Sequence, residues 1–259
     1  MNTPIQKVAL ITGASSGIGA ELARQLASAG WFVGLMARRE DKLEEIVQGI
    51  RKNEGHAEYF VCDVTDASAM KRAVSELLAK AQAPLTWLIA NAGYSDFIDV
   101  NHFNTDTAHQ VISTNLLGVT YTVAAGLPHL LKQERGRIIV ISSIAGSIGL
   151  PGASVYCASK AAVNIFCESL RRDLFHKKIA VTVVCPGFIK TPMIDKNTFP
   201  MPMVLEVDVA ARKIIQAAER GCDRFIFPRA LYWLTLFGHL APNWLWKMVP
   251  KSARFSQNF

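Results

Sequence analysis

Short runs of apolar residues alternate along this chain with longer segments whose apolar residues recur at helical spacing. The runs predict buried strands at residues 8–11, 31–37, 57–62, 85–90, 137–141, 179–185 and 224–227. The helical spacing predicts helices at residues 18–29, 41–51, 67–81, 108–131 (bent near Pro128), 155–175 and 208–219. Fully apolar strands separated by helices are typical of a parallel sheet covered on both faces. The pattern predicts an α/β fold with a doubly wound parallel sheet, which binds ligands beyond the carboxyl ends of its strands.

Composition fits a globular chain but leaves its partner open. Of 259 residues, 50% are hydrophobic and 19% are charged, which excludes a disordered or collagen-like protein. No repeat, low-complexity stretch or Gly/Ser-rich linker divides the chain, so we expect one domain at residues 1–228 and a tail at residues 229–259. The formal charge of +7 is compatible with nucleic acid, an anionic membrane surface or an anionic small ligand.

Cysteine usage and the N-terminal region predict a cytoplasmic protein. The five cysteines form no C-x-x-C pair, so neither a zinc ribbon nor another metal site is expected. Free, reduced and partly buried thiols are typical of the cytoplasm. The first apolar run is too short for a signal peptide, and no window of about 18 residues is apolar throughout, so no plain transmembrane helix is expected.

The first predicted strand and helix are joined by a glycine-rich turn, T-G-A-S-S-G-I-G at residues 12–19. Glycines permit the dihedral angles of a tight turn, and their missing side chains let backbone N–H groups approach a ligand. The N-terminus of the following helix favours an anion such as a pyrophosphate. In this strand–turn–helix context the motif indicates a dinucleotide site rather than an ordinary turn.

The octapeptide resembles the glycine-rich turn of the short-chain dehydrogenase/reductase family, and later motifs agree with that family in order and spacing. These motifs are Asp63-Val64, Asn91-Ala92-Gly93, Asn115 in a T-N-L-x-G context, Ser142-Ser143, Tyr156 and Lys160 in Y-x-x-x-K, and the P-G-x-x-x-T loop at residues 186–191. The resemblance spans residues 5–227 and implies an NAD(P)-dependent oxidoreductase. The cofactor-binding residues that it implies, together with those of the turn and of the second strand's end, are Gly13, Ser15, Ser16, Gly17, Ile18, Gly19, Arg38, Arg39, Asp63, Val64, Asn91, Ala92, Gly93, Tyr156, Lys160, Pro186, Gly187, Ile189 and Thr191.

Tyr156 and Lys160 lie four residues apart at the start of a predicted helix, so their side chains share one face. A free tyrosine has a pKa of about 10, and we expect the nearby ammonium to lower the pKa of Tyr156. Ser143 ends a predicted strand, where its hydroxyl can donate to the same substrate oxygen. The resemblance implies that Tyr156 protonates the carbonyl oxygen, that Lys160 also holds the nicotinamide ribose, and that Asn115 holds a water in a proton relay.

The end of the second strand bears on the choice between NADP(H) and NAD(H). Ala37 stands where relatives that use NAD often carry Asp, whose carboxylate accepts from a free ribose 2′-hydroxyl. Arg38 follows, and its guanidinium can pair with a 2′-phosphate. NADP(H) is therefore favoured over NAD(H). Ser15 and Ser16 stand where some NADP-dependent relatives place a basic residue, and Arg38 and Arg39 can also be solvated charges at the start of a helix.

The segment after Gly187 is expected to close over the substrate, because it is rich in methionine and aliphatic residues. An apolar lining favours a hydrophobic ketone, aldehyde or secondary alcohol. The alternative is an ordinary lid that packs on the core. The candidate substrate-contacting residues are Ser143, Tyr156, Phe188 and Met193.

The tail at residues 229–259 holds three of the five tryptophans and four cations, Arg229, Lys247, Lys251 and Arg254, and no Asp or Glu. Tryptophan with Lys or Arg on a short amphipathic helix is typical of a helix lying in a membrane interface. One hypothesis is therefore that the tail holds the protein on an anionic bilayer. The alternatives are that it packs on a partner subunit, that it covers the active-site mouth, or that its end from residue 252 is disordered.

Two classes of function fit these observations. The first is an NADP(H)-dependent carbonyl reductase or alcohol dehydrogenase, and the second is a cofactor-binding regulatory or scaffold protein on the same fold. The intact Ser143, Tyr156 and Lys160 favour the enzyme, since a pure binder needs none of them. No nucleic-acid-binding motif accompanies the positive charge, so no nucleic acid is expected. The resemblance also implies a homodimer or homotetramer, formed through helices at about residues 103–131 and 155–175.

Overall fold

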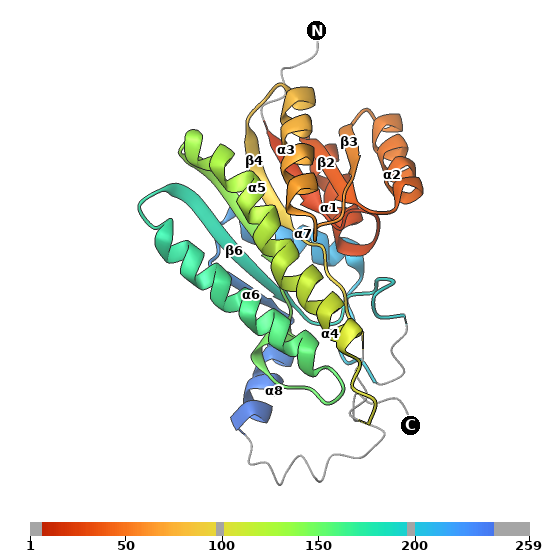
Figure 1. Cartoon of the computed structure of the whole chain (residues 1–259), viewed down its shortest axis with the longest axis vertical. Helices are drawn as coiled ribbons and strands as arrows, with labels where there is room; N and C mark the ends of the chain where they lie inside the picture. Colours follow the sequence, from red (N-terminus) through yellow and green to blue (C-terminus); the bar gives the residue numbers. More distant parts are fainter. Residues whose placement is uncertain (1–6, 97–100, 196–199, 241–259) are drawn as a thin grey trace.

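A computed structural model describes residues 7–96, 101–195 and 200–240 of the chain, and these form a parallel sheet covered by helices on both faces (Figure 1). The strands are β1 (Val8–Thr12), β2 (Phe32–Ala37), β3 (His56–Val61), β4 (Leu85–Ala90), β5 (Arg135–Ile141), β6 (Lys178–Pro186) and β7 (Arg224–Phe227). The helices are α1 (Gly17–Ser28), α2 (Glu40–Lys52), α3 (Ala67–Ala81), α4 (Thr105–Ile112), α5 (Gly118–Lys132), α6 (Ser154–Asp173), α7 (Val207–Glu219) and α8 (Arg229–Leu240), with the short turns η1 (Ser113–Leu117) and η2 (Ile144–Ser147).

The sheet has the strand order β3-β2-β1-β4-β5-β6-β7, and every pairing is parallel. The order reverses between β1 and β4, so the two halves of the sheet wind in opposite directions from that point. In such a sheet a crevice opens beyond the carboxyl ends of the strands at the reversal. The doubly wound α/β fold predicted from the hydrophobic pattern is confirmed.

The two faces of the sheet carry separate hydrophobic cores because successive side chains of a strand point to opposite sides. In β1, Val8 and Leu10 pack with α3, α5 and α6, whereas Ala9 and Ile11 pack with α1, α2 and α7. All five residues of β1 are buried. Burial on both faces explains why this strand, like β2 and β4, is apolar with almost no alternation.

The predicted helix at residues 108–131 is divided in the structure. α4 ends at Ile112, the π-helical turn η1 follows at Ser113–Leu117, and α5 then continues through Pro128 to Lys132. A break in the regular α-helix therefore lies around Asn115, and α5 runs on through Pro128, near which the sequence predicts a bend. The hydrophobic pattern could not locate the π-helical turn, because the apolar residues of the predicted helix keep helical spacing across it.

Within the described residues, one helical stretch, Thr105–Lys132, is long and apolar enough to cross a membrane, with a mean hydropathy of 1.2. Its α5 part packs on α3, β4 and β5. Its buried side chains, among them Val119, Val123 and Leu130, belong to the core on that face of the sheet. We therefore interpret the stretch as a core helix of the fold.

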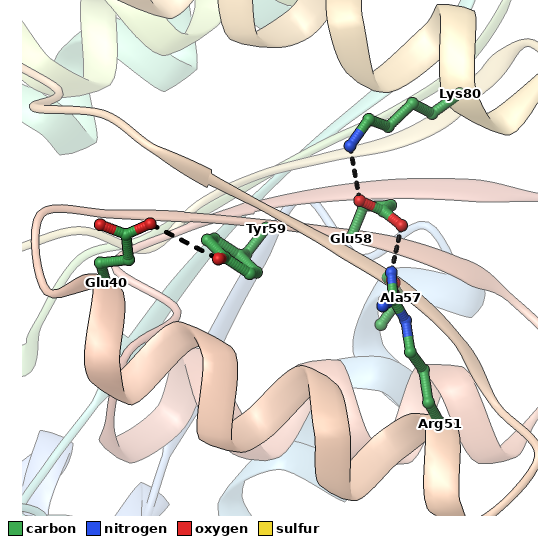
Figure 2. Close-up of polar contacts among 6 residues, drawn as sticks. All are labelled: Glu40, Arg51, Ala57, Glu58, Tyr59 and Lys80. Carbon is green, nitrogen blue, oxygen red and sulfur yellow. Dashed lines mark hydrogen bonds and ion pairs between the residues drawn. The ribbon is translucent and has the colours of Figure 1, made fainter.

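The edge strand β3 is held by polar contacts to the helices on both faces (Figure 2). Glu58 pairs with Lys80 of α3 at 2.7 Å and also with Arg51 of α2. Arg51 Nε donates to the carbonyl oxygen of Ala57 at 3.1 Å, and Tyr59 lies 3.5 Å from a carboxylate oxygen of Glu40. A charged side chain bound on both sides of an edge strand fixes its position and opposes pairing with another chain.

The predicted tail begins as a helix, α8, which contacts β7 and η2. Residues 241–259, with Trp244, Trp246, Lys247, Lys251 and Arg254, lie outside the described residues. All five cysteines are free thiols, and four of them are buried. This state agrees with the prediction from their spacing.

Candidate active site

The glycine-rich turn is fastened to the end of β4 by the Asn91-Ala92-Gly93 motif. The amide of Asn91 donates to the carbonyl oxygens of Thr12 and Gly13, at 2.9 and 3.2 Å. The backbone N–H groups of Asn91 and Ala92 donate in turn to the Thr12 hydroxyl, at 3.1 and 3.2 Å. Gly13 has a φ of +64°, and a Cβ there would lie 2.7 Å from the Cα of Ala92, so only glycine fits. The two motifs therefore form one rigid unit.

Helix α1 begins directly after the turn, at Gly17. Its N-cap residue, Ser16, makes no side-chain capping bond, so the first N–H groups of the helix remain available to an anion. Gly17 has a φ of +55°, and a Cβ there would lie 3.0 Å from Cγ2 of Thr191 on the opposite loop. The missing side chain keeps a channel open between the turn and the P-G-x-x-x-T loop.

Two arginines follow β2 and lie against this channel. Arg39 donates to the Ser15 hydroxyl through Nη2 at 2.9 Å and to the Ser16 hydroxyl at 2.7 Å. Nη1 of Arg38 lies 3.6 Å from a carboxylate oxygen of Asp63, and both side chains are substantially exposed. The carboxylate of Asp63 also accepts from the backbone and the hydroxyl of Thr65. Two guanidinium groups therefore face one end of the cavity.

Asn115 lies in the π-helical turn η1 and is fully buried. Its side-chain oxygen accepts from the Tyr94 N–H at 2.8 Å, and its amide donates to the Tyr94 carbonyl at 2.9 Å and to the Ser159 hydroxyl at 3.0 Å. Ser159 lies on α6 between Tyr156 and Lys160. Asn115 therefore joins the loop after β4 to the helix that carries those two residues.

Ser143, Tyr156 and Lys160 come from two neighbouring elements. Ser143 follows β5, and its hydroxyl caps the turn η2 by accepting from the Ala145 N–H at 3.1 Å. Nζ of Lys160 lies 5.8 Å from the centroid of the Tyr156 ring and donates to the Ile141 carbonyl at 3.1 Å. These contacts place the lysine between the end of β5 and the tyrosine ring.

Burial shifts the pKa of both Tyr156 and Lys160 on α6. It raises the pKa of Tyr156 to about 12, although hydrogen bonding to Ser143 acts in the opposite direction. Burial also lowers the pKa of Lys160 to about 8. The expectation that the ammonium would lower the pKa of Tyr156 is therefore wrong for this structure, because burial of the phenol sets the direction of the shift.

A cavity of about 380 Å³ extends along the glycine-rich turn, Arg38 and Arg39 and is also lined by Tyr156 and Lys160. The predicted residues that line it are Gly13, Ser15, Ser16, Gly17, Ile18, Arg38, Arg39, Asp63, Val64, Asn91, Ala92, Gly93, Tyr156, Lys160, Pro186, Gly187, Phe188, Ile189, Thr191 and Met193. Gly19, Asn115 and Ser143 do not belong to the lining. Gly19 packs against Asn91, and Asn115 lies behind the residues that line the cavity. Ser143 stands in the sequence between two lining residues, Ser142 and Ala145.

Part of the lining was not among the predicted site residues, although Ser142 belongs to a predicted motif and Pro192 and Ile194 belong to the segment expected to close over the substrate. The additional residues are Ala37, Cys62, Ser95, Thr114, Ile141, Ser142, Ala145, Leu150, Ala153, Pro192 and Ile194. Many of them adjoin a predicted residue and would follow from extending each motif by one position. Leu150 and Ala153 belong instead to the loop between η2 and α6, which has no motif of its own.

Within the described ranges, no group of three or more His, Cys, Asp or Glu side chains is placed to hold a metal ion. The cavity is lined by Tyr156 and Lys160 and also by Arg38 and Arg39.

Comparison with known proteins agrees with this geometry. The model of the short chain dehydrogenase family matches residues 7–200. An uncharacterized oxidoreductase of Myxococcus xanthus (strain DK1622) is 34% identical over 248 residues, with 96% of this chain and 98% of that protein covered. The chain thus belongs to the short-chain dehydrogenase family of oxidoreductases, and this membership supports an enzyme that acts on CH–OH or C=O groups.

Two further relatives differ in the activity that they carry. A fatty acyl-CoA reductase of Acinetobacter baylyi (strain ATCC 33305 / BD413 / ADP1) is 39% identical over 191 residues, which cover 73% of this chain and 64% of that protein. The crystal structure of a variant of actinorhodin polyketide ketoreductase with NADPH is similar at a TM-score of 0.78 and 28% identity, covering 88% of this chain and 97% of that one.

Proposed function

We propose that this protein is an NADP(H)-dependent oxidoreductase that transfers hydride between the nicotinamide and a carbonyl or secondary alcohol of a hydrophobic compound. The observation that carries the proposal is the juxtaposition of Tyr156 and Lys160 in the same cavity as the glycine-rich turn. A cofactor held by the turn would therefore end beside the proton-carrying groups. NAD(H) is the less favoured cofactor.

The lining of the cavity near Gly93 supports the binding of this cofactor. At Gly93, a Cβ would lie 3.5–3.8 Å from Asn115, Lys160 and Met193, so the absent side chain leaves room where these residues converge. The residues proposed to hold the cofactor are Gly13, Ser15, Ser16, Gly17, Ile18, Gly19, Arg38, Arg39, Asp63, Val64, Asn91, Ala92, Gly93, Tyr156, Lys160, Pro186, Gly187, Ile189 and Thr191. When bound, the nicotinamide supplies the hydride for reduction or accepts it in oxidation.

The chain's own groups supply the proton and the orientation. Because burial raises its pKa, Tyr156 is protonated at neutral pH and can donate to a carbonyl oxygen. Ser143 would donate a second hydrogen bond to that oxygen as negative charge develops. Lys160 would hold the ribose hydroxyls, and Asn115, with its side chain fixed by Tyr94 and Ser159, would hold the relay water near its turn.

The substrate end of the cavity is mostly apolar. Phe188 and Met193 line it together with Leu150 and Ile194. Lys190, the nearest lysine of this loop, is exposed and paired with Glu206 at 3.1 Å, so it is not placed to bind a substrate carboxylate. These features support a hydrophobic ketone, aldehyde or secondary alcohol.

A change of one arginine tests the cofactor assignment. We expect wild-type protein to use NADPH with a higher kcat/KM than NADH, in a screen of carbonyl compounds graded in size and polarity. Arg38→Leu should lower kcat/KM for NADPH by about tenfold or more, through loss of a charge-assisted contact, and leave NADH unchanged. Arg24→Leu on the outside of α1 is the matched control. A wild-type preference for NADH refutes the assignment.

We also propose a homodimer or homotetramer in the cytoplasm, without nucleic acid as a partner. Helices α5 and α6 and the turn η1 expose the large apolar side chains Leu117, Leu131 and Ile165, which a second copy can cover. The free thiols support a reducing compartment.

A further inference from the structure

Helix α8 is fixed on one side to the wall of the cofactor cavity. Leu231 is buried, and its Cδ2 lies 2.8 Å from the position that a Cβ of Gly187 would take. Gly187 itself lines the cavity. Figure 1 shows α8 beyond the carboxyl ends of the strands, at the same end of the molecule as α4. The position of this helix relative to the active site is therefore set by packing.

The opposite face of α8 is aromatic and open to solvent. Trp233 is 54% exposed and Phe237 is 66% exposed. The two residues are four apart on the helix, so their rings lie on the same face one turn from each other. A tryptophan and a phenylalanine side by side on the outside of a helix have no role in the core of this domain.

The same end of the molecule carries further exposed apolar side chains. Met203 and Val204 lie in the segment between β6 and α7, and Phe103 lies just before α4. Met193, also exposed, is both part of this rim and part of the cavity lining. Single exposed apolar residues are ordinary, but a group of them on segments that all follow the carboxyl ends of strands indicates a surface that is covered in use. We call Phe103, Met193, Met203, Val204, Trp233 and Phe237 the apolar rim.

The positive charge of residues 229–259 favours one partner for the apolar rim over another. Residues 229–259, which begin with α8, carry Arg229, Lys247, Lys251 and Arg254 and no acidic residue. A second copy of this segment would bring the same cations, so the two would repel each other. An anionic bilayer complements the cations and receives the aromatic side chains, and tryptophan beside Lys or Arg is the usual composition at a membrane interface.

We propose that α8 and the apolar rim lie on the surface of an anionic bilayer, with Trp233 and Phe237 inserted at the headgroup–acyl boundary. The cavity then opens toward the membrane and receives carbonyl compounds dissolved in it. The second part of this proposal rests on the proposed oxidoreductase function, whereas the first part does not.

Vesicle sedimentation tests the docking directly. The full-length protein should sediment with vesicles of phosphatidylcholine and phosphatidylglycerol, and weakly or not at all with phosphatidylcholine alone. Raising the ionic strength should weaken the binding, because salt screens the attraction between the cations and the lipid. Trp233→Ser combined with Phe237→Ser should weaken it by at least about tenfold, since two aromatic side chains no longer leave water.

A matched double variant controls for loss of surface hydrophobicity. Val61→Ser with Phe175→Ser removes two exposed apolar side chains from β3 and from the segment after α6, and should leave vesicle binding unchanged. The proposal is overturned if the wild-type protein does not bind anionic vesicles, or if both double variants bind as it does. It is also overturned if Trp233→Ser with Phe237→Ser dissociates an oligomer without any effect on lipid.

Measurements of NADPH oxidation distinguish a failure of the membrane-docking proposal from a failure of the proposed oxidoreductase function. With a water-soluble carbonyl and no lipid, the Trp233→Ser/Phe237→Ser variant should oxidise NADPH at the wild-type rate. With a long-chain ketone dissolved in anionic vesicles, its rate should fall by about the same factor as its vesicle binding. Absence of turnover in every protein contradicts the enzyme assignment and leaves the sedimentation result to stand on its own. Equal rates with the vesicle-dissolved ketone overturn membrane delivery.

Discussion

Lys160 is a buried amine whose charge lowers the stability of the folded protein. Only 4% of its surface is exposed, and burial lowers its pKa from 10.5 to about 8. Below pH 8 the folded protein therefore holds a charge away from water, with the Ile141 carbonyl as a hydrogen-bond acceptor. A pKa that is lower in the folded state than in the unfolded state reduces stability wherever the group is charged in both.

Replacement of this lysine should stabilise the fold. Lys160→Met keeps most of the side-chain volume and removes the buried charge, so we expect the free energy of unfolding at pH 7 to rise by about 1–3 kcal/mol. The wild-type protein regains this stability as the lysine loses its proton, so the difference should shrink between about pH 8 and pH 10.5. Urea unfolding across that pH range measures it, and turnover should fall by about a hundredfold or more.

An exposed lysine provides the control. Lys213→Met on α7 should change the free energy of unfolding by less than about 0.5 kcal/mol at any pH in this range. If Lys160→Met is less stable than wild type at pH 7, the buried ammonium does not destabilise the fold, and this description of Lys160 is wrong.

At the residue scale, most residues that the sequence predicted for the site line the cavity, Gly19, Asn115 and Ser143 excepted, but the sequence did not predict their environment. The spacing of Tyr156 and Lys160 places them on one helix face, and the structure agrees. The direction of the shift in the pKa of Tyr156 depends on burial of its side chain, which packs against the cluster that contains Ala153 and Cys157. Burial is a tertiary property, and the local motif carries no information about it.

The glycine-rich turn and the Asn91-Ala92-Gly93 motif behave as a single element. Each would be a flexible loop by itself, but the Asn91 amide satisfies the carbonyls of Thr12 and Gly13, and the Thr12 hydroxyl accepts from the second motif. These bonds fix the backbone that would contact a pyrophosphate. The binding of the cofactor should therefore depend on Asn91 even though its side chain is turned toward the protein.

Removal of this amide should affect stability and cofactor binding together. Asn91→Ala leaves two partly buried carbonyls unpaired, and we expect the free energy of unfolding to fall by about 1–3 kcal/mol. The Kd for NADPH, measured by fluorescence titration, should rise by about tenfold as the turn loosens. Asn53→Ala, which removes an exposed bond to the Gly49 carbonyl at the end of α2, should change neither quantity appreciably. Unchanged NADPH affinity in Asn91→Ala would show that the two motifs act separately.

The sequence predicted the positions of strands that are buried along their whole length. It did not predict the interruption of a helix at a residue whose side chain makes long-range hydrogen bonds. Strands β1, β2 and β4 are apolar runs in the sequence and buried strands in the structure. The helix predicted at residues 108–131 contains instead a π-helical turn, at which Asn115 bonds with Tyr94 and Ser159. Those partners are distant in sequence, so helical periodicity cannot reveal the turn.

At the scale of the whole molecule, two groups of basic residues bear on the choice of partner. Arg38 and Arg39 lie at one end of the cofactor cavity, and the acid-free segment from residue 229 contributes four further cations. The proposed dinucleotide and the proposed anionic lipid surface would account for these positions without nucleic acid. The sequence alone predicted the doubly wound sheet, but the exposed faces of Trp233 and Phe237 became visible only once α8 was placed on the domain.

Direct observation of hydride transfer tests the central claim that this site reduces a carbonyl. NADPH carrying deuterium at the reactive carbon of the nicotinamide, one sample for each face, is incubated with the carbonyl panel and the products are analysed by mass spectrometry. One sample should deliver a single deuterium to the alcohol product. Tyr156→Phe should lower turnover by about 10²–10⁴-fold with little change in the Kd for NADPH. Tight NADPH binding without transfer to any carbonyl, or near-normal turnover in Tyr156→Phe, would contradict the account.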